Sequence, residues 1–146
     1  MTYTELFTQL VRAEIELWDA LSERLHADTG VSVSQFQALS AVASIDGGAR
    51  VQDISNEMSI TVGATSKLVD RLERDAFVVR QSNPTDRRSS IVVLTDEGHR
   101  ALQSAAAGAE KHLRMMLESG IPQSRAESLA SDLSELRSLV VNGVSS

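Results

Sequence analysis

The stretch ITVGATSKLVDRLERDAFVVRQSNPTDRRSSIVVLTDEG, residues 60–98, decides the fold, because its apolar side chains first recur at helical spacing and then follow one another as in strands. Ala64, Leu68 and Leu72 lie four residues apart, the spacing of one face of an amphipathic helix. The hydroxyl of Thr61 can cap the start of that helix. We therefore expect a helix that begins at Thr61 and turns these three side chains toward a core.

Two short apolar runs follow this helix, Phe77–Arg80 and Ile91–Leu94, with a polar loop at residues 81–90 between them. Runs of apolar and β-branched residues bounded by polar turns are typical of strands. Asn83 and Pro84 favour a turn within the loop. The sequence therefore predicts a small two-stranded hairpin directly after the helix.

Helical periodicity organises the chain on both sides of this stretch. The expected helices are, in chain order, Thr4 to about His26 with a break at residues 27–31, Ser32 to Ser44 opened by a Ser32 and Gln35 capping box, Val51–Met58, Thr61 to about Asp75, a long helix capped by Thr95, and a last helix after Gly120-Ile121-Pro122 that ends near Val141. A short helix, a tight turn, a second helix and a hairpin make up a winged helix-turn-helix. The predicted fold class is mainly α, with a two-stranded β wing.

The helices at the two ends of the chain carry apolar stripes that the middle is too small to cover. Such faces are expected to pack against each other and against a second copy of the chain. We therefore predict dimerisation helices at residues 1–30 and 119–146, a winged helix-turn-helix DNA-binding domain at 31–95, and a long linking helix at 96–118.

Composition limits the class of protein. A chain of 146 residues can bury one core, and none of its apolar runs approaches the roughly 18 to 20 residues that span a bilayer. Acidic residues stand near the N-terminus, where a signal peptide would carry positive charge, so we expect a cytoplasmic protein with no membrane partner. The absence of cysteine excludes disulfides and thiolate metal sites.

The net charge of −6 is unevenly distributed. Residues 1–49 carry 2 basic and 7 acidic side chains, whereas residues 50–90 carry 7 and 6. A local excess of cations inside an acidic chain is one way in which a protein presents a surface to nucleic acid. A segment of this length is also often near neutral by chance, so the charge distribution alone does not decide the matter.

The exposed face of the helix that starts at Thr61 is small and polar in its first turns, with one cation. Small side chains allow close approach to a major groove, while hydroxyls and lysine reach phosphates or base edges, and Val62 can meet a thymine methyl. The candidate DNA-contacting residues here are Thr61, Val62, Gly63, Thr65, Ser66 and Lys67. An ordinary solvated helix face is the alternative interpretation.

Asp86, Arg87 and Arg88 lie near the tip of the predicted hairpin. Two cations on a thin projection can enter a minor groove, where the negative potential is strong. Asp86 is placed to pair with the Arg88 guanidinium and orient it before contact. Alternatively, the three residues form a solvated salt bridge that contributes only about 0 to 1 kcal/mol to the hairpin.

The same stretch resembles the MarR family of winged helix-turn-helix regulators. Asp86-x-Arg88, Leu94-Thr95 and Gly98 match the family's wing pattern, and LVDRLE at residues 68–73 matches the end of its recognition helix. The resemblance implies a homodimer with intertwined end helices, a recognition helix that begins near Thr61, and Arg88 in the minor groove. It also implies a pseudo-palindromic double-stranded operator, repression, and release of the DNA by a small-molecule effector.

The sequence departs from the family pattern at Ala76, where the family usually has glycine after the recognition helix. Alanine is strained in a left-handed C-terminal position, so we expect this helix to end differently. The lack of cysteine excludes the thiol-based peroxide sensors of the family. Because His26, His99 and His112 are scattered, no metal site and no cofactor are expected.

Trp18 and Phe36 are candidates for lining an effector pocket, although apolar residues on an amphipathic stripe are more simply core or dimer interface. A winged-helix module that binds protein, without sequence-specific DNA binding, is the alternative function. An enzyme is not expected, because the sequence contains no grouping of serine, histidine and acid, no phosphate-binding glycine loop and no metal motif.

Overall fold

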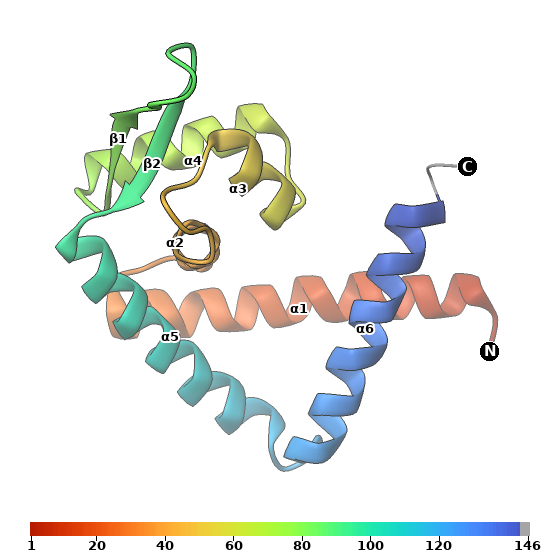
Figure 1. Cartoon of the computed structure of the whole chain (residues 1–146). Coiled ribbons are helices and arrows are strands. Elements are labelled where there is room, and N and C mark those ends of the chain that lie inside the picture. The colour runs from red at the N-terminus through yellow and green to blue at the C-terminus, as the bar shows by residue number, and fades with distance from the viewer. Residues whose placement is uncertain (144–146) are drawn as a thin grey trace. The chain divides into compact units, whose positions relative to one another are not determined.

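The computed structural model describes residues 1–143 and, within them, contains six helices and one two-stranded antiparallel sheet (Figure 1). The elements are α1 (Tyr3–Thr29), α2 (Val33–Ala43), α3 (Val51–Met58), α4 (Val62–Arg74), β1 (Val78–Ser82), β2 (Ser90–Leu94), α5 (Asp96–Leu117) and α6 (Gln123–Gly143). The predicted fold class, mainly α with a winged helix-turn-helix, is confirmed. None of these helices is long and apolar enough to cross a membrane.

The chain divides into two compact units, residues 1–110 and 111–146, and α5 runs from the first into the second. The first unit contains every element from α1 to the wing, and α2 packs against α1, α3, α4 and β2 within it. In the second unit, no described residue of α6 is buried. The helix-turn-helix and the wing therefore both belong to the first unit.

Helix α1 is longer than predicted. Residues 27–31 do not break it at His26, because the helix continues to Thr29 and ends only at Gly30, which has a φ of 74°. The Gly30 amide donates to the His26 carbonyl over 2.8 Å, and glycine adopts this left-handed conformation at little steric cost. The stop signal is thus the single glycine rather than the polar residues before it.

The starts of α2 and α4 are capped as predicted. The Ser32 hydroxyl accepts from the Gln35 amide over 3.1 Å, and the Gln35 side chain accepts from the Ser32 amide over 3.0 Å, which completes a capping box. Thr61 accepts from the Ala64 amide over 3.1 Å. Between α3 and α4, Ser59 turns the chain with a φ of 55°. Each cap satisfies a backbone donor that the first helical turn leaves without a partner.

The core of the first unit is a cluster of aliphatic side chains from α2, α3, α4 and both strands. Its fully buried members include Leu39, Ile54, Val69, Leu72, Val78 and Val92. Burying a side chain of this size contributes about 1.5 to 3 kcal/mol. Because these residues come from five different elements, the cluster holds the recognition helix and the wing in one body.

The buried stripe of α4 differs from the prediction in its first turn. Leu68 and Leu72 are buried as expected, but Ala64 is exposed and Thr65 is buried instead. An α-helix has 3.6 residues per turn, so positions exactly four apart drift around its axis by about 40° per step. The stripe therefore follows a spacing of three and four residues, and Thr65 takes the place assigned to Ala64.

The hairpin is longer at its tip than predicted, because β1 extends to Ser82 and β2 begins at Ser90. The register pairs Val78 with Leu94 and Ser82 with Ser90. Ala49, just before α3, exchanges two backbone hydrogen bonds of 2.9 and 2.7 Å with Val92. The base of the wing is therefore bonded on one side to the segment that leads into α3.

Ala76 occupies the left-handed position after α4, with a φ of 62°. The Phe77 amide donates to the Leu72 carbonyl over 2.9 Å and the Ala76 amide to the Glu73 carbonyl over 3.0 Å, the bond pattern of a Schellman motif. The expectation that alanine would make this helix end differently is wrong. The surrounding hydrogen bonds hold the conformation although alanine carries a Cβ.

Thr95 and Gly98 join this helix end to α5. The Thr95 hydroxyl donates to the Ala76 carbonyl over 2.5 Å and accepts from the Gly98 amide over 2.9 Å, which confirms Thr95 as a cap. A Cβ on Gly98 would lie 1.9 Å from the Phe77 carbonyl oxygen. The Thr-x-x-Gly pattern thus has a structural cause, since it lets α5 start against the end of the recognition helix.

Candidate nucleic-acid interface

The first turn of α4 presents a small and open surface. Val62 is 45% exposed, and Gly63 and Lys67 are exposed beside it, with Ser66 half-buried. A Cβ on Gly63 would meet no heavy atom within 4 Å. The face can therefore approach another molecule closely, and the free N-terminal amides of the helix favour negative charge there.

Thr65 does not belong to this open face, and its assignment as a DNA-contacting residue is corrected. Its side chain is fully buried, and its hydroxyl donates to the Thr61 carbonyl over 2.8 Å. A buried hydroxyl that already donates to a carbonyl has no free donor for a phosphate or a base. The role of Thr65 is to join the first turn of α4 to its cap.

Further along α4, three cations that follow one another at helical spacing surround a shallow hollow. Lys67, Arg71 and Arg74 line it together with Asp70, and its volume is about 370 Å³. Across residues 1–143, none of the three cations forms an ion pair with a carboxylate. Arg71 was not among the predicted DNA-contacting residues. Its position four residues after Lys67 indicates that the two side chains lie on the same face of the helix.

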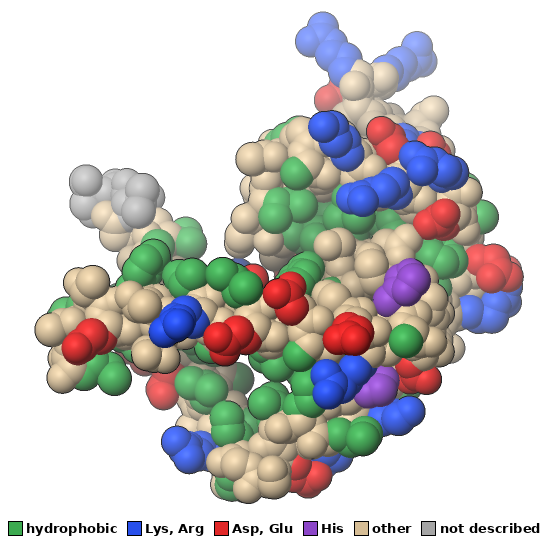
Figure 2. Space-filling model, turned by 180° about the vertical axis from the view of Figure 1, so that it is seen from behind, with side chains coloured by type: hydrophobic (Ala, Val, Ile, Leu, Met, Phe, Trp, Pro, Cys, Tyr) green, Lys and Arg blue, Asp and Glu red, His purple; other side chains and the backbone are tan. Residues whose placement is uncertain are grey.

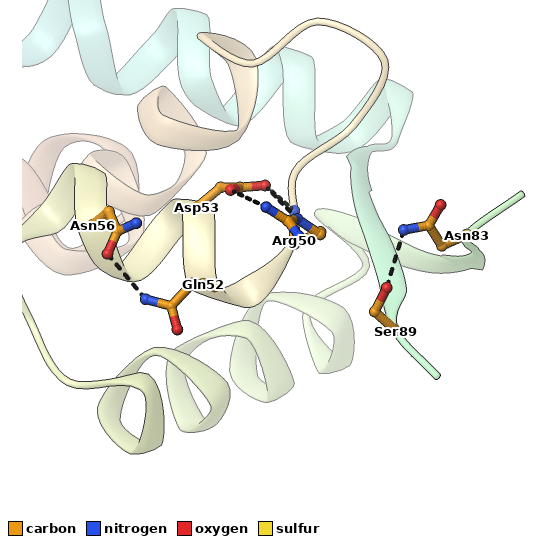
Figure 3. Close-up of polar contacts among 6 residues, drawn as sticks. All are labelled: Arg50, Gln52, Asp53, Asn56, Asn83 and Ser89. Atoms are coloured by element: carbon orange, nitrogen blue, oxygen red, sulfur yellow. Dashed lines mark hydrogen bonds and ion pairs between the residues drawn. The ribbon is translucent and has the colours of Figure 1, made fainter. Parts of the chain in front are cut away.

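The tip of the wing is shaped by side-chain hydrogen bonds to nearby groups. The Asn83 side-chain oxygen accepts from the Thr85 amide over 3.1 Å, and its side-chain nitrogen donates to the Ser89 hydroxyl over 3.0 Å (Figure 3). This confirms Asn83 as a turn residue, because Asx side chains favour such local bonds. The tip is consequently a defined turn that presents the cations of residues 87 and 88.

Asp86 acts differently from the prediction. Its carboxylate accepts from the Arg88 backbone amide over 2.9 Å, and within the described residues it forms no ion pair with the Arg88 guanidinium. The predicted charge pair is therefore wrong, because a carboxylate two residues earlier reaches the main chain more directly than the long side chain. Asp86 fixes the backbone of the tip and leaves the guanidinium available.

One side of the hairpin carries a second polar hollow, of about 380 Å³. It is lined by Arg80, Gln81, Ser82, Arg87, Arg88, Ser89 and Ser90. Figure 2 shows basic side chains projecting from the wing and further ones on the body beneath it. The guanidinium groups of Arg87 and Arg88 and several hydroxyls on one side of a thin projection make a surface suited to phosphate oxygens.

Arg80 differs from the other wing arginines because its charge is already paired. Its guanidinium bonds to Asp70 over 2.7 Å and to Glu73 over 2.9 Å, both on α4. Burial lowers the pKa of Arg80, but its bonds to the two carboxylates outweigh this effect and raise the pKa above the usual value. The side chain is 27% exposed. Arg80 is thus a link between strand and helix, and no local sequence pattern indicates this contact.

Arg50, at the start of α3, is a further exposed cation near the wing (Figure 3). Its guanidinium donates to both carboxylate oxygens of Asp53, over 3.1 and 3.2 Å. This pairing raises the pKa of Arg50 and lowers the pKa of Asp53. On the same helix, the Gln52 side chain donates to Asn56 over 2.9 Å. The polar side chains at the start of α3 and along it thus lie in the same unit as the polar side chains of α4 and the wing.

The other candidates from the sequence lie away from these cations. Trp18, on α1, is 37% exposed, and Phe36, on α2, is half-buried. Their assignment to an effector pocket stays a prediction. Among residues 1–143, no group of three or more His, Cys, Asp or Glu side chains is placed to hold a metal ion.

Comparison with known proteins links this arrangement to one family. Residues 29–89 match the family model described as the MarR family. The regulator MhqR of Bacillus subtilis is 28% identical over 94 residues, which cover 64% of this chain and 63% of MhqR. The repressor MdtR of the same organism is 32% identical over 79 residues, covering 54% and 50%. The matched part of the chain thus spans about half to two thirds of these relatives' lengths.

A solved structure shares the arrangement over nearly the whole chain. It is Sco3205 of Streptomyces coelicolor, a MarR family transcriptional regulator in complex with DNA, at a TM-score of 0.79 and 26% identity. The alignment covers 96% of this chain and 86% of that one. The similarity therefore extends beyond the DNA-binding elements to the helices at both ends.

Proposed function

We propose that the chain is a member of the MarR family of winged helix-turn-helix proteins, a dimeric transcriptional regulator that binds DNA and carries no catalytic activity. The observation that carries the proposal is the placement, on both elements that read DNA in this fold, of cations that form no ion pair within residues 1–143. Lys67 lies on the open face of α4, and Arg87 and Arg88 lie at the tip of the wing.

The first turns of α4 enter the major groove. Gly63 allows close approach, Val62 packs against a thymine methyl, and Ser66 and Lys67 donate to phosphates or base edges. Thr61 contributes chiefly as the cap that leaves the following amides facing a phosphate. Arg71 and Arg74, farther along the helix, extend the positive face toward the DNA backbone.

The wing reaches the adjacent minor groove. Arg88 inserts its guanidinium there, and Arg87 contacts the flanking phosphates. Asp86 supports this contact through the Arg88 backbone amide, so that the tip is already ordered before DNA arrives. Ordering the tip in advance reduces the entropy lost on binding.

A second copy of the chain covers the apolar faces of the end helices. The large exposed hydrophobic residues of α1 are Tyr3, Leu6, Phe7, Val11, Ile15, Leu17 and Trp18, and those of α6 are Leu129, Leu133, Leu139, Val140 and Val141. In this proposal residues 1–30 and 119–146 form the dimerisation region, residues 31–95 the DNA-binding domain and residues 96–118 the link, and residues 144–146 of the predicted region lie outside the described residues. A two-fold dimer presents its recognition helices to successive major grooves, about 34 to 36 Å apart, and so favours a pseudo-palindromic operator.

Binding of this kind represses transcription when the operator overlaps a promoter, and MdtR, a relative, is named a repressor. A small molecule that prefers a dimer with another helix spacing would release the DNA. Trp18 and Phe36 are the candidates for contacting such an effector. The net charge of −6 fits an intracellular regulator whose few placed cations must select a site against non-specific attraction.

The proposal is tested by selecting DNA from a random library of 30-base-pair duplexes with the purified full-length protein. We expect enrichment of a pseudo-palindrome, and fluorescence anisotropy should give an affinity for it at least about 10³-fold above that for unselected duplex. The logarithm of the affinity should fall linearly with the logarithm of salt concentration. Selection that enriches no sequence would favour the protein-interaction module instead.

A further inference from the structure

The recognition helix carries two acidic side chains, Asp70 and Glu73, beside its cations, and both are bonded to one arginine from the wing. Arg80, on β1, donates through one guanidinium nitrogen to Asp70 and through another to Glu73, over 2.7 and 2.9 Å. Its backbone amide also donates to Glu73, over 3.2 Å. A single residue of the wing is therefore fastened to the helix at three points.

The place of Arg80 within the hairpin makes these bonds important for the tip. In the register, Arg80 lies opposite Val92, whose backbone is bonded to Ala49. Beyond Arg80 the hairpin extends for about 10 Å before the turn begins at Asn83. A small rotation of the strand at Arg80 is therefore enlarged at the tip, where the unpaired cations stand.

We propose that Arg80 is a positioning residue for DNA binding: by bonding to Asp70 and Glu73 it fixes the wing relative to the recognition helix, so that Arg88 reaches the minor groove while α4 occupies the major groove. The inference rests on the proposed function. It assigns Arg80 no contact with DNA of its own, because two of its guanidinium nitrogens already donate to carboxylates and its charge is paired within the protein.

Arginine suits this task better than lysine. A planar guanidinium can donate to two separate carboxylates at fixed angles, whereas an ammonium group acts as a point charge on a flexible stem. A bond between groups that are partly exposed contributes little to folding by itself. Substitution of Arg80 should consequently affect DNA binding much more than stability.

The first test is a double-mutant cycle measured by fluorescence anisotropy on the duplex enriched from the random library. The variants are Arg80→Ala, Arg88→Ala, the combination of both, and Arg80→Lys, with Arg100→Ala as the control. Arg100 pairs with Glu97 on the exposed surface of α5, so its loss removes one paired arginine without touching the wing. Circular dichroism and size-exclusion chromatography check that each variant is folded and in the wild-type oligomeric state.

If Arg80 acts by positioning Arg88, Arg80→Ala should weaken binding about tenfold in the wild-type background and by about twofold or less once Arg88 is absent, a coupling in the usual range for residues that act together. Arg80→Lys should restore little of the loss. If the combined variant instead loses affinity by the product of the two single fold-changes, the two residues act independently. Arg80 would then contact DNA itself, and the inference would be overturned. Unchanged binding by Arg80→Ala would also overturn it.

The second test separates positioning from simple charge. The paired substitution Asp70→Asn with Glu73→Gln removes two negative charges near the DNA, so electrostatics alone predicts tighter binding to every duplex. Positioning predicts a lower ratio of affinity for the enriched duplex to affinity for unselected duplex. An unchanged or higher ratio would contradict the inference while leaving the proposed function intact. A wild-type protein that enriches no duplex would instead overturn the proposed function.

Discussion

At the scale of single residues, Ala76 shows how local hydrogen bonds can hold a backbone conformation that the side chain disfavours. The residue keeps a φ of 62° at the end of α4. Its carbonyl accepts the Thr95 hydroxyl, and the amides of residues 76 and 77 satisfy the last carbonyls of the helix. Left-handed backbone costs an L-residue with a Cβ about 1 to 2 kcal/mol. The fold tolerates this cost because three bonds converge on one turn.

Replacing Ala76 with glycine should therefore stabilise the protein. Ala76→Gly removes the Cβ that is strained at positive φ, and we expect the free energy of unfolding to rise by about 1 kcal/mol. Urea unfolding at a fixed protein concentration measures the change. Ala106→Gly is the matched control, because Ala106 is exposed within helix α5 and its replacement should lower stability by a similar amount. A loss of stability in Ala76→Gly would contradict the strain argument.

At the scale of elements, the N-terminal caps of the helices could be predicted from sequence, whereas the ends of α1 and α4 and the contacts between distant elements could not. Ser32, Thr61 and Thr95 act through neighbours three residues away, so their roles are visible in the sequence. The bond from Arg80 to Asp70 joins an element to a different one, and no local pattern specifies it. The predicted pair of Asp86 with the Arg88 guanidinium was wrong for a related reason. The sequence allows the carboxylate to bind either the side chain or the backbone amide of Arg88, and in the structure it binds the amide.

The glycines of two elements give opposite predictions for the same substitution. Gly98→Ala would place a Cβ 1.9 Å from the Phe77 carbonyl, so α5 must move away from the recognition helix, and we expect a loss of about 2 to 3 kcal/mol in thermal or urea unfolding. Gly63→Ala meets open space and should stabilise α4 by up to about 1 kcal/mol.

For Gly63→Ala, the effect on DNA binding should be opposite to the effect on stability. Gly63→Ala should weaken binding to the enriched duplex although the protein is more stable, because the added methyl lies where close approach to the groove is proposed. Tighter or equal binding by this variant would show that the first turn of α4 does not approach DNA as closely as required.

At the scale of the whole molecule, the distribution of charge and apolar surface divides the chain by task. The first 49 residues carry 7 acidic and 2 basic side chains, while α4 and the wing together carry six basic side chains, Lys67, Arg71, Arg74, Arg80, Arg87 and Arg88. Large hydrophobic residues are exposed chiefly on α1 and α6. The proposed dimer would cover the apolar surface of α1 and α6 and leave the basic surface of α4 and the wing for DNA.

The dimer is tested on the apolar stripe of α6. Leu133→Glu places a charge on that stripe and should weaken dimerisation, because a carboxylate would be buried without a partner. Ser131→Glu adds the same charge on the opposite side of the helix and should leave the dimer intact. Sedimentation equilibrium across a concentration series gives the dimer dissociation constant of each variant. Equal dissociation constants for the two variants would argue against this face of α6 as the dimer interface.

The affinity of Arg88→Ala for the enriched duplex at two salt concentrations shows whether the recognition helix and the wing arginine bind DNA together. Wild type and Arg100→Ala serve as references, and chromatography confirms the oligomeric state. We expect the binding free energy of Arg88→Ala to fall by about 1 to 3 kcal/mol and its salt dependence to be shallower by about one phosphate contact, with Arg100→Ala close to wild type. Binding by Arg88→Ala that equals wild type at both salt concentrations would contradict this expectation.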